Sequence, residues 1–227
     1  MTEYAVKLAE AGLKINAMKL NAKNPFQWAS GFFMPIYNDN RMFLFYPEFR
    51  KLILDGFLDI IRTKKIIIDV IAGTSTAGIP HGTLLAEALG LPFIYIREKP
   101  KAHGLKNQIE GIDAEKDLEG KKIIVIEDLI STGGSSAKAV QAVREANGKV
   151  DYCLSIFSYN LLNALNEFAK LDKPCKVLSI LEYDTLIDTA KKTGYISDEQ
   201  QEALKLWRHE PFEWGEKRGF ARIVKKQ

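Results

Sequence analysis

Apolar residues follow two different spacings along the 227 residues of the chain. A helical spacing of three to four positions is found over residues 2–15 and again over 47–63, where Pro47 suits the first helical turn. Between these segments, residues 19–45 are rich in aromatic and turn-forming residues, which predicts short strands and loops. The N-terminal part is therefore expected to be a helix followed by irregular β structure.

From residue 66 onward, short apolar runs alternate with segments of helical spacing. Strands are expected over residues 66–71, 93–96, 121–126, 150–157 and 176–181. The intervening helices are expected to end near Gly90 and to cover residues 135–147 and 160–170. Strands that are apolar throughout and alternate with helices indicate a parallel sheet covered on both faces.

The predicted fold is therefore α/β, with a parallel central sheet flanked by helices and a small N-terminal subdomain. Residues 1–45 are assigned to that subdomain and residues 46–227 to the α/β core. The core is expected to end in a helical segment over residues 184–208 and a polar tail, with Trp207 and Trp214 as packing residues.

Composition narrows the class of protein. A hydrophobic content of 46% with 27% charged residues is ordinary for a soluble globular chain, and a net charge of +3 is too weak for nucleic-acid binding through bulk charge. No stretch has the character of a secretion signal or a membrane span. Cys153 and Cys175, which form no CxxC, are expected to be buried reduced thiols. We expect a cytoplasmic protein with neither nucleic-acid nor membrane partners.

Candidate chemistry concentrates after the apolar run 123–126. Two carboxylates, Glu127 and Asp128, come first and are followed by a turn rich in hydroxyl groups and glycine over residues 129–136. Backbone N–H groups in such a turn, together with the start of the next helix, form an anion site. Like charges repel, so the acids suit sugar hydroxyls or Mg²⁺ beside a phosphate rather than the phosphate itself. An ordinary strand–turn–helix with a serine N-cap is the simpler alternative, but capping does not require two preceding acids.

This segment resembles the phosphoribosyl-diphosphate (PRPP) signature of type I phosphoribosyltransferases. Three further segments resemble motifs of orotate phosphoribosyltransferases. Residues 97–111 are similar to the catalytic loop of that family, residues 69–80 to its diphosphate loop, and residues 26–41 to its hood over the base site. On these four motifs in order, the chain is identified as a member of the orotate phosphoribosyltransferase family.

The resemblance implies roles for individual residues in a transfer from PRPP to a ring nitrogen of orotate. Lys101 and His103 would be catalytic and, with Arg97, would stabilise charge on the departing diphosphate. Glu127 and Asp128 would hold the ribose, and Ser131 and Arg41 would contact orotate. The remaining residues expected to bind PRPP are Thr74, Leu129, Ile130, Thr132, Gly133, Gly134 and Ser135, with residues 131–135 cradling the 5′-phosphate.

The resemblance also implies a cofactor and an assembly. Mg²⁺ would be bound mainly through PRPP, with Asp128 as a possible protein ligand. The chain would form a homodimer in which the loop carrying Lys101 and His103 enters the neighbouring site. Residues 97–106 carry four basic residues and one acidic residue, an excess equal to the net charge of +3 of the whole chain. We expect this loop to open for substrate and to close against water.

The chain departs from the family pattern at three places. Ala29 stands where many orotate enzymes carry a lysine, residues 158–161 lack the arginine expected to meet the orotate carboxylate, and Phe33-Met34 replaces a Lys-Ser pair. Transfer to a purine base and a non-enzymatic PRPP sensor are the alternatives, although residues 1–45 contain neither a basic patch nor a helix-turn-helix pattern. His81 is interpreted as a capping or exposed residue, and His209 as a surface residue.

Overall fold

The structure is a computed structural model that describes residues 2–99, 108–112 and 118–223. Its contacts divide the chain into two compact units. Residues 46–180 form one of them, here called the core unit, whereas residues 1–45 and 181–227 together form the other, the hood unit. The sequence-based division had placed residues 181–227 with the core. The grouping differs because the C-terminal helices pack against the first helix and the N-terminal strands.

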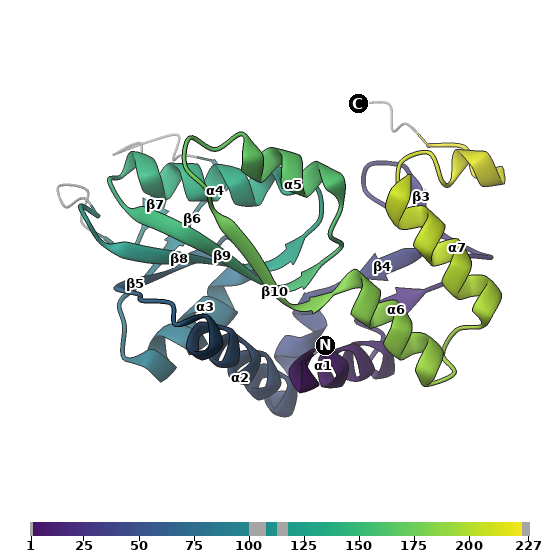
Figure 1. Cartoon of the computed structure of the whole chain (residues 1–227), viewed down its shortest axis with the longest axis horizontal. Helices are drawn as coiled ribbons and strands as arrows, with labels where there is room; N and C mark the ends of the chain where they lie inside the picture. Colours follow the sequence, from purple (N-terminus) through teal and green to yellow (C-terminus); the bar gives the residue numbers. More distant parts are fainter. Residues whose placement is uncertain (1, 100–107, 113–117, 224–227) are drawn as a thin grey trace. The chain divides into compact units, whose positions relative to one another are not determined.

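The core unit is built on a six-stranded sheet with the order β10-β9-β8-β5-β6-β7 (Figure 1). β5 pairs in parallel with β6 and β8, and β8 pairs in parallel with β9, which confirms the expected α/β class. The edge strand β7 runs antiparallel to β6. The strands are β5 (Val70–Thr74), β6 (Phe93–Ile96), β7 (Ile109–Glu110), β8 (Lys122–Ile130), β9 (Lys149–Ser158) and β10 (Lys176–Glu182).

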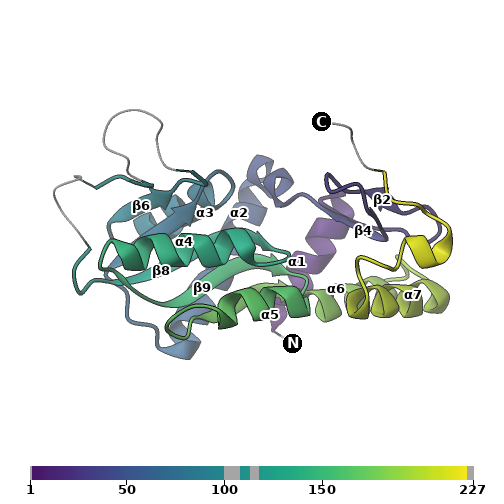
Figure 2. The ribbon, with the colours of Figure 1, turned by 90° about the horizontal axis from the view of Figure 1, so that it is seen from above.

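Helices cover both faces of this sheet. α4 and α5 lie on one face and α2 and α3 on the other, and Figure 2 looks onto α4 and α5. Every residue of β5 is buried, as expected for a central strand between two helical layers. The helices are α2 (Pro47–Lys64), α3 (Gly78–Leu89), α4 (Gly134–Glu145) and α5 (Leu162–Ala169).

Two strands are shifted relative to their predicted bounds. The apolar run 66–71 predicted a strand, but β5 begins only at Val70, and Ile67 is 68% exposed. Asp69 fixes this register, because its N–H donates to the Lys122 carbonyl at 2.7 Å and its carboxylate accepts from the Lys122 N–H at 2.8 Å. β8 extends to Ile130, so the two acids lie within the strand rather than directly after it.

The hood unit contains short strands and three α-helices. α1 (Glu3–Lys14) confirms the expected first helix and packs on α6 (Tyr183–Lys192). The helical segment expected over 184–208 is divided in two, since Gly194 adopts a left-handed φ of 74° between α6 and α7 (Asp198–His209). The other elements are β1 (Met18–Leu20), β2 (Phe26–Gln27), β3 (Phe33–Met34), β4 (Ile36–Asn38) and the 3₁₀ helices η1 (Asn40–Phe45) and η2 (Glu216–Arg218).

Aromatic residues from both ends of the chain form the interior of the hood unit. Trp207 is fully buried, with its ring centroid 6.2 Å from that of Trp28 and 5.2 Å from that of Tyr183. Its indole N–H donates to the Met34 Sδ at 3.0 Å. Trp214 is also buried and donates to a backbone carbonyl at 3.1 Å. Both tryptophans are therefore packing residues, as predicted.

The two cysteines are free thiols, as expected from the sequence. Cys153 is buried and Cys175 half-buried, and both are free. Burial raises the pKa of both thiols, that of Cys175 to about 12, so they stay protonated at neutral pH. Among the described helices, none is both long and apolar enough to cross a bilayer.

Candidate active site

The strand order places a ligand-binding edge between β5 and β8. From β5 the chain continues to β6 on one side, whereas from β8 it continues to β9 on the other side. Ligands of open α/β sheets bind beyond the carboxyl ends of the strands where the order reverses in this way. The segments that leave β5 and β8 at this edge are residues 75–77 and 131–133.

Both segments lead directly into helices whose starts are not capped by a side chain. α3 and α4 have no side-chain cap hydrogen bond and no acidic residue in the first turn. The first N–H groups of a helix have no partner within the helix, and together with the helix dipole they attract anions. Two such starts on neighbouring strands suit a ligand that carries phosphate groups at two positions.

Glycine is required at the turn before α4. Gly133 has a φ of +81°, and an added Cβ would lie 2.8 Å from the Cα of Ala164 in α5. Any side chain here would push α5 away from the turn. In the same turn Ser131 is half-buried, whereas Thr132 and Ser135 are exposed. The predicted cradle over residues 131–135 thus forms a compact turn with accessible hydroxyl groups at the start of a helix.

The two acids of β8 lie in different environments. Glu127 is 6% exposed, and its two carboxylate oxygens accept hydrogen bonds from the Thr74 Oγ1 at 2.7 Å and the Ser136 Oγ at 2.9 Å. Burial raises the pKa of Glu127 to about 7, although the two hydroxyl donors act in the opposite direction. Asp128 is only partly buried. Of the two acids, Asp128 is therefore the more accessible.

The start of α3 is packed closely against the middle of β8. An added Cβ on Gly78 would lie 2.3 Å from the carbonyl oxygen of Ile126 and 2.6 Å from the Oγ1 of Thr74. Thr74, the last residue of β5, is itself buried. The diphosphate-loop motif predicted from the sequence therefore lies directly beside the acidic end of β8.

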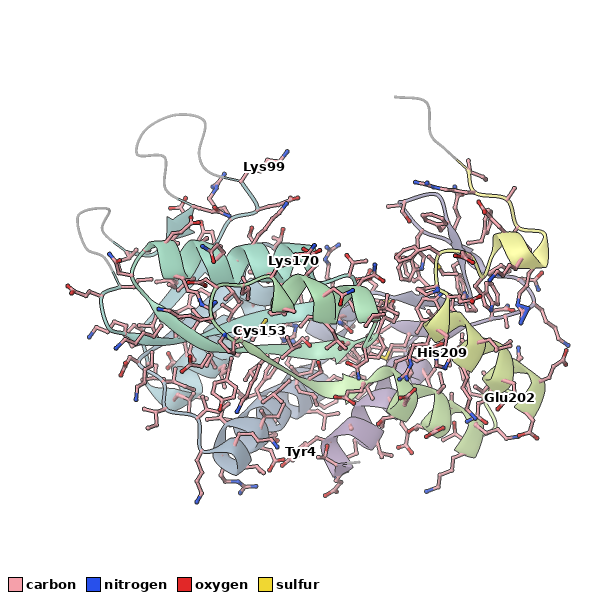
Figure 3. All side chains as sticks on the ribbon, turned by 45° about the horizontal axis from the view of Figure 1, so that its top comes forward. Tyr4, Lys99, Cys153, Lys170, Glu202 and His209 are labelled. Carbon is pink, nitrogen blue, oxygen red and sulfur yellow. The ribbon has the colours of Figure 1, made fainter. Side chains whose placement is uncertain are left out.

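The basic segment after β6 is described only at its two ends. The Arg97 N–H donates to the Gln108 carbonyl at 2.8 Å, and the Arg97 guanidinium lies 3.5 Å from a Glu110 carboxylate oxygen in β7. Lys99 is the last described residue before the gap (Figure 3). Lys101 and His103, the predicted catalytic residues, lie outside the described residues.

Comparison with known proteins determines the family. Residues 46–192 match the model of the phosphoribosyl transferase domain. An orotate phosphoribosyltransferase of Cytophaga hutchinsonii is 44% identical over 211 residues, which cover 93% of this chain and 98% of the relative. One of Staphylococcus saprophyticus is 47% identical over 204 residues, covering 90% and 98%. The chain belongs to the orotate phosphoribosyltransferase family.

The fold agrees with this family. The crystal structure of an orotate phosphoribosyltransferase from Aeropyrum pernix matches with a TM-score of 0.69 at 24% identity, covering 84% of this chain and 99% of that one. The family assignment predicted from the four motifs is therefore confirmed.

The departure from the family pattern at Phe33-Met34 has a structural explanation. The ring of Phe33 lies 5.8 Å from that of Phe220, and Met34 is buried as the acceptor for Trp207. Both residues thus pack against the C-terminal segment of the same unit. Arg41, predicted to contact orotate, is an exposed residue of η1 in this unit, and its N–H donates to the Asp39 carboxylate at 3.2 Å.

Two residues near the site were not predicted from the sequence. Ser136 directly follows the predicted cradle, but only the structure shows that it donates to Glu127. The interpretation of His81 as a capping or exposed residue was wrong, because it is 3% exposed and its Nδ1 has no hydrogen-bond partner. Burial lowers the pKa of His81 to about 4, so it is neutral at physiological pH. His209 is exposed on α7, as predicted (Figure 3).

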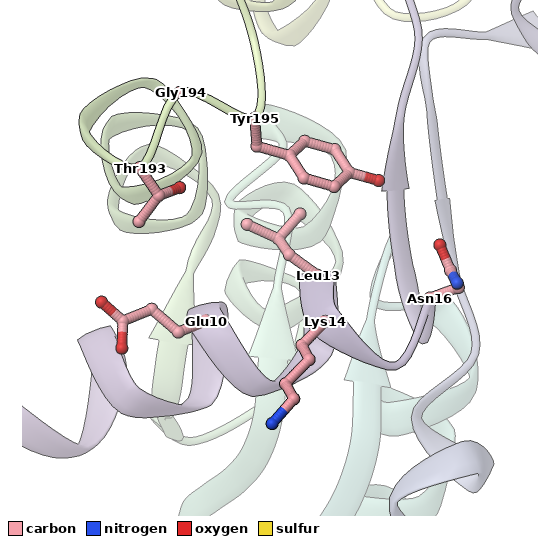
Figure 4. Close-up of a pocket in the computed structure, with 7 residues that line it drawn as sticks. All are labelled: Glu10, Leu13, Lys14, Asn16, Thr193, Gly194 and Tyr195. Atoms are coloured by element: carbon pink, nitrogen blue, oxygen red, sulfur yellow. The ribbon is translucent and has the colours of Figure 1, made fainter.

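The hood unit also contains an open pocket of about 480 Å³ between α1 and the turn after α6 (Figure 4). None of its lining residues belongs to a motif of the orotate phosphoribosyltransferase family identified above. These residues are Glu10, Leu13, Lys14, Asn16, Thr193, Gly194 and Tyr195. The site that the motifs predict therefore remains at the edge between β5 and β8.

Proposed function

We propose that this member of the orotate phosphoribosyltransferase family transfers the 5-phosphoribosyl group of PRPP to orotate. The products are orotidine 5′-monophosphate and diphosphate, in the synthesis of pyrimidine nucleotides. The bond between the ribose C1 and the diphosphate oxygen breaks, and a bond from C1 to a ring nitrogen of orotate forms. The observation that carries this proposal is the pair of uncapped helix starts at the switch point, with the acidic end of β8 beside them.

Each end of PRPP is assigned to one of the two helix starts. The 5′-phosphate is held by the turn over residues 131–135 and the first N–H groups of α4, where the exposed Thr132 and Ser135 offer hydroxyl donors. The diphosphate lies at the loop after Thr74 and the start of α3. The acidic end of β8 faces the ribose between them. Holding both ends of one substrate fixes C1 for attack by the base.

The leaving diphosphate gains negative charge as its bond to C1 breaks. Lys101 and His103, with Arg97 at the foot of the same loop, supply the positive charge that stabilises it. A Lys101→Ala variant is expected to lower kcat by about 100-fold, equivalent to roughly 2.7 kcal/mol of barrier. Steady-state kinetics with saturating PRPP measure this, with Lys19→Ala, an exchange in the hood strand β1, as the matched control. Undiminished turnover of Lys101→Ala would assign the leaving-group charge to another residue.

Ser131 and Arg41 are proposed to contact orotate, as the family resemblance implies. We further propose a homodimer in which the loop with Lys101 and His103 completes the neighbouring site, and a cytoplasmic location. Analytical ultracentrifugation measures whether the protein sediments as a monomer or as the proposed homodimer. Mixing a Lys101→Ala chain with a chain defective in its phosphate turn tests the shared site, because a mixed dimer would recover part of the activity.

Magnesium fits the acids of β8 as a substrate-bound ion. Within the described residues, no group of three or more His, Cys, Asp or Glu side chains could hold a metal. Both oxygens of Glu127 are engaged by hydroxyl donors, which leaves the partly buried Asp128 as the candidate ligand. Magnesium is commonly held by one or two carboxylates together with substrate phosphates. When bound, it would neutralise part of the charge on PRPP.

An acceptor comparison tests the proposed function directly. Purified protein is mixed with PRPP and Mg²⁺, and the loss of orotate absorbance is followed in parallel with adenine, guanine, hypoxanthine and uracil as acceptors. We expect turnover with orotate and none with the purines. Turnover with a purine and none with orotate would replace this proposal by the alternative from the same superfamily, and binding of PRPP without any transfer would favour the sensor.

A further inference from the structure

The backbone of Arg97 is held at the edge of the core sheet by one residue. Its N–H donates to the Gln108 carbonyl at 2.8 Å, and the side-chain amide of Gln108 donates to the Arg97 carbonyl at 2.9 Å. Both residues directly adjoin the antiparallel pair of β6 and β7, in which Ile96 lies opposite Ile109. Because its N–H and its carbonyl are both bonded, the remaining freedom of Arg97 lies mainly in its side chain.

Glu110 of β7 lies on the same face of this edge as the Arg97 side chain. Tyr95 and Glu110 are directly opposite each other across β6 and β7, and Arg97 follows Tyr95 by two residues. Residues two apart in an extended segment share a face, and long side chains reach diagonal neighbours on the adjacent strand. The Arg97 Nη1 accordingly lies 3.5 Å from the Glu110 Oε1.

This contact restrains the guanidinium without neutralising it. The Nε of Arg97 is buried and has no hydrogen-bond partner among the residues that the structure describes, so Glu110 is the polar group that limits rotation of this side chain there. The side chains of Arg97 and Glu110 are 41% and 19% exposed. A single contact leaves most of the five guanidinium donors available to a ligand.

Competition between Glu110 and the diphosphate for Arg97 is the opposite interpretation. A carboxylate that saturates an arginine commonly forms two parallel hydrogen bonds of about 2.7–2.9 Å. The contact of 3.5 Å is longer and joins one nitrogen to one oxygen. Its geometry favours orientation of the arginine over competition for it.

We propose that Glu110 is a positioning residue, which orients the Arg97 guanidinium toward the leaving diphosphate on a backbone fixed by Gln108. The inference rests on the proposed function, since it takes Arg97 as a ligand of the diphosphate. It adds to the site an acidic residue that touches no substrate and acts on an anion through a neighbouring cation. Restricting the rotamers of a long side chain before binding lowers the entropy lost when the ligand arrives.

Two ligands that differ by the diphosphate test this role. Isothermal titration calorimetry with Mg²⁺ present measures the dissociation constants of PRPP and of ribose 5-phosphate, which lacks the diphosphate. For Glu110→Ala we expect PRPP to bind about 5-fold more weakly, as expected for loss of a partly exposed ion pair, and ribose 5-phosphate to change by less than about 2-fold. Glu110→Gln retains an acceptor oxygen and is expected to restore PRPP affinity to within about 2-fold of wild type.

A double-mutant cycle tests whether Glu110 acts through Arg97. Arg97→Ala is expected to weaken PRPP binding by about 30-fold, because it removes a charged donor to the diphosphate. Adding Glu110→Ala to that variant should change the affinity by less than about 2-fold further. Asp59→Ala, which removes another arginine–carboxylate pair of the core unit, to Arg62 on α2, is the matched control and should leave both affinities unchanged. Thermal unfolding shows that each variant is folded.

Three outcomes would overturn the proposal. Tighter binding of PRPP by Glu110→Ala and Glu110→Gln would show that Glu110 competes with the ligand. Unchanged PRPP affinity in Glu110→Ala would leave the pair structural, and an equal loss with and without Arg97 would mean that Glu110 acts elsewhere. Failure of the wild-type protein to convert orotate would instead refute the proposed transfer, and the titrations, which use no orotate, would still judge Glu110. A wild-type protein that does not bind PRPP would refute both.

Discussion

Two helices of the hood unit start differently from two helices of the core unit, although α6 of the hood unit also has no side-chain cap and α5 of the core unit has neither a cap nor an acidic first turn. In the hood unit, α1 and α7 are capped by the side chains of Thr2 and Ser197, and both have acidic residues in their first turns. In the core unit, α3 and α4 have neither feature. A side-chain cap stabilises a helix by about 1 kcal/mol. The core unit forgoes this stabilisation at the two helix starts that face the switch point, which leaves their N–H groups to an anionic ligand.

The two units also differ in how far apart in the sequence their interacting segments lie. Thr74, Glu127 and Ser136 come from the end of β5, the interior of β8 and the start of α4, segments that the motifs already mark. The interior of the hood unit instead joins residues near the opposite ends of the chain. Arg222 places its guanidinium 4.2 Å from the centre of the Phe32 ring, and the Ile223 N–H donates to the Gly31 carbonyl at 3.0 Å. A site built from local motifs can be read from sequence more readily than a cluster of this kind.

The largest effect is expected from an acid placed at an uncapped helix start. Ser135→Asp adds a negative charge to the first turn of α4. This charge interacts favourably with the helix dipole and stabilises the helix, but it repels a bound phosphate. We expect PRPP to bind at least about 100-fold more weakly, with an unchanged or slightly raised melting temperature. Calorimetry and thermal unfolding measure the two quantities. Ser135→Asn, similar in size but neutral, is the matched control, and equal weakening by both substitutions would show that charge at this turn is unimportant.

A histidine in each unit gives the next comparison. His81 is buried at the start of α3, where a positive charge is unfavourable, whereas His209 is exposed in the last turn of α7. Because the pKa of His81 falls to about 4 in the folded state, the unfolded chain binds a proton between pH 6.5 and pH 4 that the folded chain does not. This histidine therefore makes stability fall as the pH decreases through that window.

The variant His81→Leu is expected to remove this term. On going from pH 7.5 to pH 5, its free energy of unfolding should rise relative to that of wild type by roughly 2 kcal/mol, because wild type loses this much stability and the variant does not. Urea denaturation at the two pH values measures the difference, and other titrating groups cancel between the proteins. His209→Gln, at an exposed position of α7, is the control substitution of a histidine. A parallel pH dependence of wild type and His81→Leu would contradict the buried neutral state.

The connection between the ends of the hood unit depends on one glycine. An added Cβ on Gly31, which has a φ of +85°, would lie 2.0 Å from the Ile223 carbonyl oxygen. Gly31→Ala should therefore displace the C-terminal segment and lower the free energy of unfolding by about 1–2 kcal/mol. Limited proteolysis near residue 220 reports the displacement. Gly219→Ala, also at positive φ but with open space around its Cβ, separates backbone strain from the lost contact. Equal losses of stability and equal proteolysis in Gly31→Ala and Gly219→Ala would contradict a specific role for the contact between Gly31 and the C-terminal segment.

The smallest effect is expected at a capped helix start of the hood unit. Ser197→Ala removes the capping box at α7, in which Ser197 and Gln200 bond to each other's backbone N–H groups. We expect a loss of about 1 kcal/mol in the free energy of unfolding, with no change in PRPP affinity. Chemical denaturation measures the loss. A change in PRPP affinity would show that this helix start is not purely structural.

The sequence by itself determined the α/β class, the order of the motifs and the turn over residues 131–135. These features depend on residue periodicity and on local backbone requirements such as the positive φ of Gly133, which act over a few neighbouring residues. The four motifs were also sufficient to identify the family. The bounds of β5 and β8 differ from those predicted, because the pairing of Asp69 with Lys122, more than 50 residues away, sets their register.

Only the tertiary structure decided where the strand order reverses, which of the two acids is buried, that His81 is enclosed, and that residues 181–223 pack with the N-terminal segment. Each of these results depends on contacts between segments that are distant in sequence. The sequence alone does not distinguish the adjacent acids Glu127 and Asp128, because both carry a carboxylate. The pleat of β8 directs Glu127 to Thr74 and Ser136 and leaves Asp128 partly exposed.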